Sequence, residues 1–206
     1  NYQSFINQGF KDQRVFSNYG VILKNLGKLE EAERFQRKAI ELNPNFANAH
    51  SNLGSILGEL GKLKEAELSQ RKAIKLNPDF AFAHYNLGIS LKELGKLKEA
   101  EISQRKAIEL NPNFAEAYSH LGNILRDLGK LEEAKNKWLK AIKLKPSLIS
   151  PTKEIATQLY LNGEYQLAIN YLKENNSDDC QSLYLSCLLC LDREKEFNQK
   201  YNELSA

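Results

Sequence analysis

Four prolines at a constant spacing constrain this chain more than any other feature. They stand 34 residues apart, at Pro44, Pro78, Pro112 and Pro146. Self-similarity at a period of about 20–50 residues is typical of proteins in which each short unit buries its apolar face by stacking on a copy of itself. The spacing therefore predicts an array of stacked repeats rather than a fold built around one central core.

Aligning the chain on these prolines, each at the thirty-second place of its unit, gives a consistent set of columns. The units run over 13–46, 47–80, 81–114 and 115–148, and a degraded unit follows at 149–182. The eighth place is Gly in four units and Ala in the fifth, the twentieth is Ala in all five, and the eleventh is always Leu. Small residues facing large ones are what close helix packing requires. Each unit is therefore expected to hold two antiparallel helices.

The turn within each unit and the end of each unit are also visible in the sequence. Gly27 and the glycines equivalent to it stand where a helix must stop and the backbone can take a positive φ. The Asn-Pro steps, such as Asn43-Pro44, end the second helix because the residue before a proline is disfavoured in the α region. Each helix is expected to be about 14 residues long, or roughly 21 Å.

The run from Ala81, AFAHYNLGISLKELGKLKEAEISQRKAIELNPNF, resembles the tetratricopeptide repeat family, and the resemblance extends over residues 13–175. The Asn-Leu-Gly run and the Asn-Pro-x-Phe-Ala junction are similar to the arrays of O-GlcNAc transferases and of related bacterial and cyanobacterial proteins. The resemblance implies an all-α fold, a right-handed solenoid superhelix of stacked helix–turn–helix units. The twenty-fourth place, usually aromatic in the family, departs from the pattern: it holds Gln36, Gln70 and Gln104.

The two ends of the chain complete the expected array as one repeat domain over residues 1–206. Residues 1–12 are interpreted as the remnant of a preceding helix, and residues 178–206 as a capping helix pair that follows an N-cap signal. Because the chain opens on Asn1 and contains no methionine, it is expected to be a piece of a longer polypeptide.

The resemblance implies that the first helices of the units line a concave groove, and the sixth place of each unit points into it. That place holds Asn18, Asn52, Asn86 and then His120. A carboxamide both donates and accepts hydrogen bonds, so a ladder of asparagines can hold the backbone of an extended peptide whatever its sequence. The alternative is that asparagine is simply the common residue of the family at this place.

The third unit carries the most apolar part of the expected groove. Phe82, Tyr85 and Ile89 share one helical stripe. Asn86 and Lys92 lie beside it, and the fourth unit adds His120, Asn123 and Arg126 to the expected site. An apolar patch in a groove is a candidate anchor for a partner. The alternative is that Phe82 or Tyr85 packs against a neighbouring helix.

Basic residues recur on the second helices, yet nucleic acid is not expected as a partner. The net charge is only +3. The arginine columns follow glutamates by four residues, as in Glu33–Arg37, Glu67–Arg71 and Glu101–Arg105, which is the favoured order for helix ion pairs. These columns are interpreted as a solvated face. No apolar run is long enough to cross a bilayer, so no membrane association is expected.

Catalytic and metal-binding constellations are not recognisable in the sequence. His50 and His84 occupy the fourth place of their units, where the family has a packing aromatic residue. Cys187 and Cys190 stand in an apolar helix without a second pair, so core packing is expected rather than redox or metal chemistry. No enzyme activity, cofactor or metal is predicted. Three clustered cysteines also make a poor disulfide framework, which favours a reducing, cytoplasmic location.

The sequence therefore predicts a non-catalytic scaffold for protein–protein interaction, whose groove binds an extended or helical segment of another protein. A second reading is the substrate-recruiting part of a larger enzyme whose catalytic domain lies outside this chain. A third is a module that associates weakly with itself through the groove or through the C-terminal cap, where Leu183, Tyr184, Leu188 and Leu191 lie.

Overall fold

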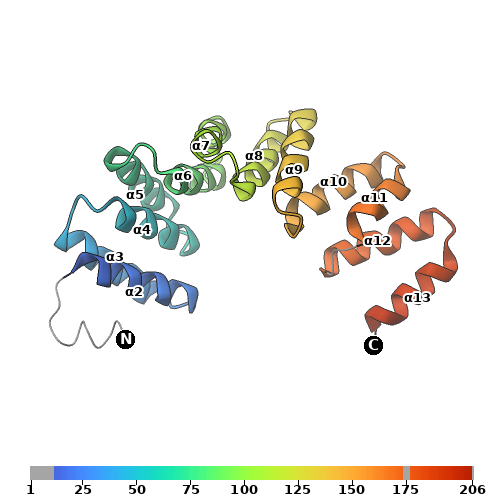
Figure 1. Cartoon of the computed structure of the whole chain (residues 1–206), viewed down its shortest axis with the longest axis horizontal. Helices are drawn as coiled ribbons and strands as arrows, with labels where there is room; N and C mark the ends of the chain where they lie inside the picture. Colours follow the sequence, from blue (N-terminus) through green and yellow to red (C-terminus); the bar gives the residue numbers. More distant parts are fainter. Residues whose placement is uncertain (1–11, 174–176, 206) are drawn as a thin grey trace. The chain divides into compact units, whose positions relative to one another are not determined.

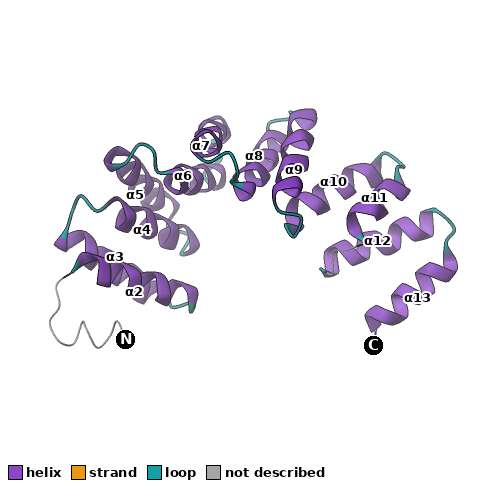
Figure 2. Ribbon diagram, viewed as in Figure 1, coloured by secondary structure: helices purple, strands orange, loops and turns teal. Residues whose placement is uncertain are grey.

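In the computed structural model, residues 12–173 and 177–205 are described, and their regular structure is entirely helical (Figures 1 and 2). The expected remnant of a preceding helix in residues 1–12 lies, except for Asp12, outside the described residues. The chain divides into two compact units, Asn1–Pro112 and Asn113–Ala206. The boundary coincides with one of the four period-setting prolines, and each unit is described by itself.

The first unit consists of three helix pairs, coloured blue to green in Figure 1. The helices are α2 (Gln13–Asn25), α3 (Leu29–Leu42), α4 (Ala47–Glu59), α5 (Leu63–Leu76), α6 (Ala81–Glu93) and α7 (Leu97–Leu110). Each helix packs against the next along the chain, and α4 also contacts both α2 and α6. The predicted all-α stack of helix–turn–helix units is confirmed.

The second unit begins with one regular pair and ends with two less regular ones. Its helices are α8 (Ala115–Asp127), α9 (Leu131–Leu144), α10 (Ile149–Leu161), α11 (Tyr165–Leu172), α12 (Asp178–Cys190) and α13 (Glu194–Ser205). The helix α10 packs against α9, α11 and α12. The helix α12 begins directly after Ser177, at the expected N-cap signal.

The predicted helix ends are confirmed. Gly27 has φ 73°, and the Lys28 amide donates to the Leu23 carbonyl at 2.9 Å, which closes the first helix with the left-handed cap that favours glycine. The equivalent glycines of the later turns share this positive φ. At the other end, Asn43 is extended, with φ −145° and ψ 94°, directly before Pro44. Local chemistry thus fixes where both helices of a unit stop.

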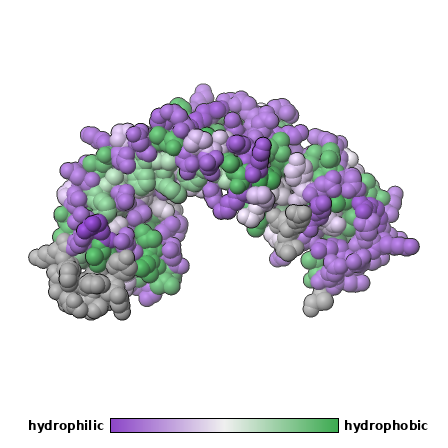
Figure 3. All heavy atoms as spheres, viewed as in Figure 1, coloured by the Kyte–Doolittle hydropathy of each residue, from purple (hydrophilic) through white to green (hydrophobic). Residues whose placement is uncertain are grey.

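The core is a series of small clusters between helices rather than one large centre. Leu53, Leu57 and Ala66 form one such cluster within the second repeat. Phe46, from a junction between repeats, packs against a cluster that contains Phe16. On the face shown in Figure 3, hydrophobic side chains are closely mixed with hydrophilic ones. Apolar surface is therefore buried both within a repeat and between adjacent repeats, as a repeat array requires.

Buried glutamines replace the family's aromatic residue at the twenty-fourth place. Gln36, Gln70 and Gln104 are fully buried. Each Nε2 donates to a main-chain carbonyl of the paired first helix: Ser17 O at 2.8 Å, Ser51 O at 2.9 Å and Tyr85 O at 3.0 Å. The glycines at the eighth place provide the room, since a Cβ at Gly54 would overlap Gln70. The departure from the family pattern is thus compensated by hydrogen bonds.

The fourth repeat uses an aromatic residue at the same place. Trp138 is fully buried in α9, and its indole Nε1 donates to Asn123 Oδ1 at 3.0 Å. A Cβ at Gly122 would overlap the indole ring. This repeat therefore follows the family pattern, with a rigid ring where the preceding repeats have a flexible amide.

The glutamines differ in one respect that a substitution can test. Gln36 Oε1 accepts from Ser17 Oγ at 2.9 Å, whereas Gln70 Oε1 is buried without a hydrogen-bond partner among the described residues. We expect Gln36→Met to lower the free energy of unfolding by about 1 kcal/mol more than Gln70→Met, because it leaves the buried Ser17 hydroxyl without its acceptor. Urea titration followed by far-UV circular dichroism measures the difference, and equal losses would contradict the assigned bonds.

Candidate binding site

The first helices of the three repeats in the first unit form one continuous surface, here called the groove face. The helix α4 lies between α2 and α6 and contacts both. A pocket of about 400 Å³ opens on this surface. Its lining comes from α2 (Val21, Lys24, Asn25), α4 (Asn48, Ser51, Asn52, Ser55), Phe80 and α6 (Phe82, Tyr85, Asn86). Four of the predicted site residues, Asn52, Phe82, Tyr85 and Asn86, therefore lie around one pocket.

The third repeat supplies the apolar side of this pocket. Phe82 is 56% exposed, a high value for a phenylalanine, and Tyr85 and Asn86 are half-buried. Tyr85 and Asn86 are neighbours on the same turn of α6, so an aromatic ring and a carboxamide meet at one place. An apolar surface bordered by amide groups can hold a side chain of a ligand while hydrogen-bonding its backbone.

Asn52 has a structural contact in addition to its place in the pocket. Its Nδ2 donates to Ser17 Oγ at 3.2 Å, which links α4 to α2. Asn18 is exposed on α2, whereas Ile89 and Lys92 are half-buried on α6, and none of these three predicted residues lines the pocket. The structure thus brings together only the central part of the site that the sequence predicted.

The remaining predicted residues belong to the second unit. Asn123 accepts the hydrogen bond from the buried Trp138. Arg126 forms ion pairs with Asp127 and Glu154, which raise the pKa of its guanidinium, with Glu154 the larger contributor. His120 lies near Glu116, whose pKa is lowered chiefly by the hydrogen bond from Lys145. In this unit the predicted polar floor is therefore tied into interactions within the protein.

The arginines of the second helices form the predicted pairs with glutamates. Arg37 pairs with Glu33 at 2.8 Å, Arg71 with Glu67 at 2.9 Å and Arg105 with Glu101 at 2.7 Å. The interpretation of these columns as helix ion pairs is confirmed.

The same residues also link one repeat to the next, which the sequence reasoning did not predict. Lys62 Nζ lies 2.8 Å from Glu33, and Arg37 lies 3.0 Å from Glu65 of the following repeat. The hydrogen bond from Lys62, followed by that from Arg37, holds the pKa of Glu33 below its ordinary value of 4.5. Glu67, Lys96 and Arg71 repeat this arrangement one unit further on.

The two predicted packing histidines have a definite structural role. His50 Nε2 lies 2.9 Å from the carbonyl oxygen of Pro44, and His84 Nε2 lies 2.9 Å from that of Pro78. Because a carbonyl only accepts, each Nε2 must carry the proton. The histidines thus tie the start of a first helix to the preceding Asn-Pro junction, as expected for structural residues.

The cysteines are free thiols in the last helix pairs. Cys180 and Cys187 are buried and Cys190 is exposed. Burial raises the pKa of Cys187 to about 11, which disfavours the reactive thiolate and supports the expected packing role. Within residues 12–173 and 177–205, no cluster of histidine, cysteine and acidic side chains is suited to a metal ion, and no helix is long and apolar enough to span a membrane.

Sequence comparison identifies the family. Models described as tetratricopeptide repeat match residues 13–46, 35–67, 81–114 and 104–136, and one described as TPR repeat matches 54–95. Together they cover residues 13 to 136 without a gap. The chain therefore belongs to the tetratricopeptide repeat family. The comparison with curated proteins gives no match.

Solved structures share the fold at low sequence identity. A structure of PilF from Pseudomonas aeruginosa is 23% identical, with a TM-score of 0.84 over 93% of this chain and 90% of that chain. A thermophilic tetratricopeptide repeat protein from Thermus thermophilus, TTC0263, is 20% identical, with a TM-score of 0.69 over 86% and 99%. YrrB, described as a tetratricopeptide repeat protein with an unusual peptide-binding site, is 24% identical, with a TM-score of 0.65 over 94% and 97%.

Proposed function

We propose that the chain is a protein-interaction module and that the pocket on the groove face binds an extended or helical segment of another protein. The observation that carries the proposal is the convergence of Asn52, Phe82, Tyr85 and Asn86 around one pocket of about 400 Å³. An opening of this size accommodates one or two side chains of a peptide, and its walls offer both apolar and amide groups.

The chemistry of the pocket favours a peptide over a small charged ligand. Lys24, the only charged residue in the lining, lies 2.8 Å from Glu59 and is thereby largely neutralised. The remaining lining is amide, hydroxyl or apolar, which suits a neutral backbone and an apolar side chain. Membership of a family whose members bind peptides, among them YrrB by its description, supports the same conclusion.

A double substitution on the groove face tests the proposal. We expect Phe82→Ala combined with Asn86→Ala to weaken binding to peptides on a random extended-peptide array at least tenfold, because it removes the exposed ring and a carboxamide from the pocket. Thermal unfolding should change little, since neither side chain is fully buried. Asn52 is left unchanged because its substitution would also break the hydrogen bond to Ser17 that links α4 to α2, and a loss of binding would then have two explanations.

A matched substitution outside the groove face serves as the control. Leu161 in the second unit is 69% exposed, and Leu161→Ala removes a similar amount of apolar surface. Peptide binding should be unaffected by this control. If the double variant binds the same peptides as strongly as the unsubstituted chain does, the pocket is not the binding site.

A further inference from the structure

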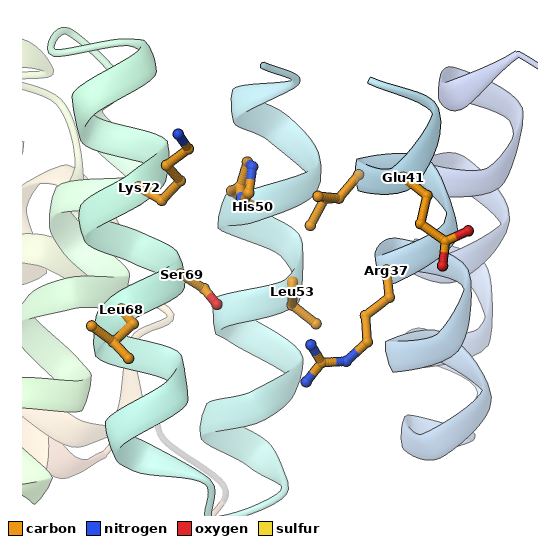
Figure 4. A pocket seen from close by; sticks show the side chains of 8 residues that line it. Arg37, Glu41, His50, Leu53, Leu68, Ser69 and Lys72 are labelled. Carbon is orange, nitrogen blue, oxygen red and sulfur yellow. The ribbon is translucent and has the colours of Figure 1, made fainter. Parts of the chain in front are cut away.

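Two further pockets lie on the side of the first unit that carries the second helices. One pocket, of about 480 Å³, lies among α3, α4 and α5 (Figure 4); it is lined by Arg37, Ile40, Glu41, His50, Leu53, Leu68, Ser69 and Lys72. The other, of about 430 Å³, lies among α5, α6 and α7; it is lined by Arg71, Ile74, Lys75, His84, Leu87, Ile102, Ser103 and Lys106. Each residue of the second list stands 34 positions after its counterpart in the first. These two sites are called the outer pockets.

Each outer pocket has an aliphatic side chain exposed at its edge. Leu68 and Ile102 are both 68% exposed, and they occupy the twenty-second place of their repeats. The other repeats have Arg34, Asn136 and Asn170 at that place. A purely solvated face would favour a polar residue at this place. The two repeats that have an aliphatic residue there are the two whose pockets it lines, which indicates an apolar binding surface.

Two lysines on α5, the helix that contributes to both outer pockets, give this surface its positive charge. Lys72 lines the first outer pocket and Lys75 the second, and both are exposed near the end of α5. Within the described part of the chain neither lysine has an acidic partner. Arg37 and Arg71, by contrast, each pair with two glutamates. The uncompensated charge between the pockets is thus positive, which favours an acidic partner.

The spacing of the two pockets also restricts which segment of a partner can occupy both of them. Leu68 lies on α5 and Ile102 on α7, two helices that do not contact each other, so the pockets are further apart than the roughly 8–10 Å of packed helices. In an α-helix, residues i, i+7 and i+11 lie on one face, and i+11 is about 16 Å from i along the axis. An acidic helix with aliphatic residues at i, i+7 and i+11 can therefore place one aliphatic side chain in each pocket, with the carboxylates of its acidic residues near Lys72 and Lys75.

We propose that the outer pockets form a second docking surface, separate from the groove face, for an acidic amphipathic helix of another protein. The partner places one aliphatic side chain against Leu68 and a second against Ile102. Its acidic groups pair with Lys72 and Lys75 on the shared helix α5. The surface is independent of the groove face, so one chain can hold two partners at the same time.

A synthetic probe tests this docking surface directly. The probe is a fluorescein-labelled, glutamate-rich helical peptide with leucines at i, i+7 and i+11, and anisotropy measures its binding to the full chain. We expect saturable binding that weakens as salt is raised. Leu68→Asn combined with Ile102→Asn should weaken it about tenfold or more. Asparagine already occupies this place in the last two repeats, so folding should be preserved, as thermal unfolding checks.

Three comparisons make the outcome specific. Lys75→Glu, which restores the residue found at Glu41 in the preceding repeat, should lower the affinity and flatten its salt dependence. A probe with serines in place of the leucines should not bind. The groove-face variant Phe82→Ala with Asn86→Ala should bind the original probe normally, so failure of one site is distinguishable from failure of the other.

Several results would contradict the proposed docking surface. These are the absence of saturable binding, equal binding by the Leu68→Asn, Ile102→Asn variant, or loss of binding only in the groove-face variant. A dimer in sedimentation runs without probe, dissolved by the same double asparagine variant, would show that a second copy covers the surface instead. If the double variant fails to fold, the two single asparagine variants and Lys75→Glu provide the same comparison.

Discussion

Trp138→Ala is expected to lower the free energy of unfolding of the second unit by about 3–5 kcal/mol, the loss typical of removing a large buried aromatic side chain. Trp138 is fully buried between the two helices of the fourth repeat, where Gly122 approaches it closely. Its removal leaves a cavity and takes away the donor that orients Asn123. Urea unfolding of the full chain, followed by far-UV circular dichroism, measures the loss.

Trp138→Phe separates packing from hydrogen bonding at this position. The smaller ring keeps most of the apolar volume but has no donor for Asn123 Oδ1, so we expect a loss of about 1–2 kcal/mol. If the two compact units unfold in separate transitions, the effect should fall on the transition of residues 113–206. A Trp138→Ala variant within about 1 kcal/mol of the unsubstituted chain would contradict this packing.

Gly54→Ala is the second substitution with a large expected effect, about 2–3 kcal/mol of destabilisation. A Cβ at this position would lie 2.8 Å from Cδ and 2.9 Å from Cγ of the buried Gln70, and would overlap its amide nitrogen as well. Gln70 would have to move away, which would break its hydrogen bond to Ser51 O. The close approach of α4 and α5 depends on this missing methyl group.

Gly58 in the same helix provides a matched control for this substitution. A Cβ at Gly58 meets nothing within 4 Å, and the backbone there is helical. Gly58→Ala should therefore stabilise the chain by about 0.5–1 kcal/mol, because alanine loses less backbone entropy than glycine in a helix. Gly54→Ala should also become much less costly in a Gln70→Ala background. Thermal unfolding of these variants measures both differences, and equal effects at the two glycines would refute the assigned contact.

The fold was predictable because its determinants are local and repeat. A glycine that allows positive φ and an Asn-Pro step that excludes the α region fix the helix ends whatever the rest of the chain does, as Gly27 and Asn43 show. The roles of His50 and of the Glu33–Arg37 pair followed from their places in the repeat. Each of these predictions depended on residues that are close together in the sequence.

The parts that sequence reasoning missed depend on side chains from two or three helices at once. The hydrogen bond of Gln70 to a main-chain carbonyl cannot be inferred from a column of glutamines, because it requires the distance between two helices. The face with Arg37 was interpreted as solvated, and the outer pocket beside it was missed. Leu68 and Ile102, aliphatic where the remaining repeats are polar, were the available signal.

The groove was only partly predictable for the same reason. The alignment placed Asn52 and Asn86 on one face, and the structure brings both to one pocket. It could not show that Asn52 also bonds to Ser17, or that Asn123 is held by Trp138. A place in the repeat fixes the direction of a side chain, whereas its neighbours decide whether it is available to a ligand.

The ion pairs between repeats recur unchanged within the first unit. Lys62–Glu33 and Arg37–Glu65 join the first repeat to the second, and Lys96–Glu67 and Arg71–Glu99 join the second to the third by the same contacts. Each repeat in this unit thus ends in a surface that fits the beginning of the next. A further copy of residues 47–80, inserted directly after the second repeat, would meet matching charges on both sides. Tandem duplication of the gene segment for this repeat would therefore lengthen the array without breaking these ion pairs.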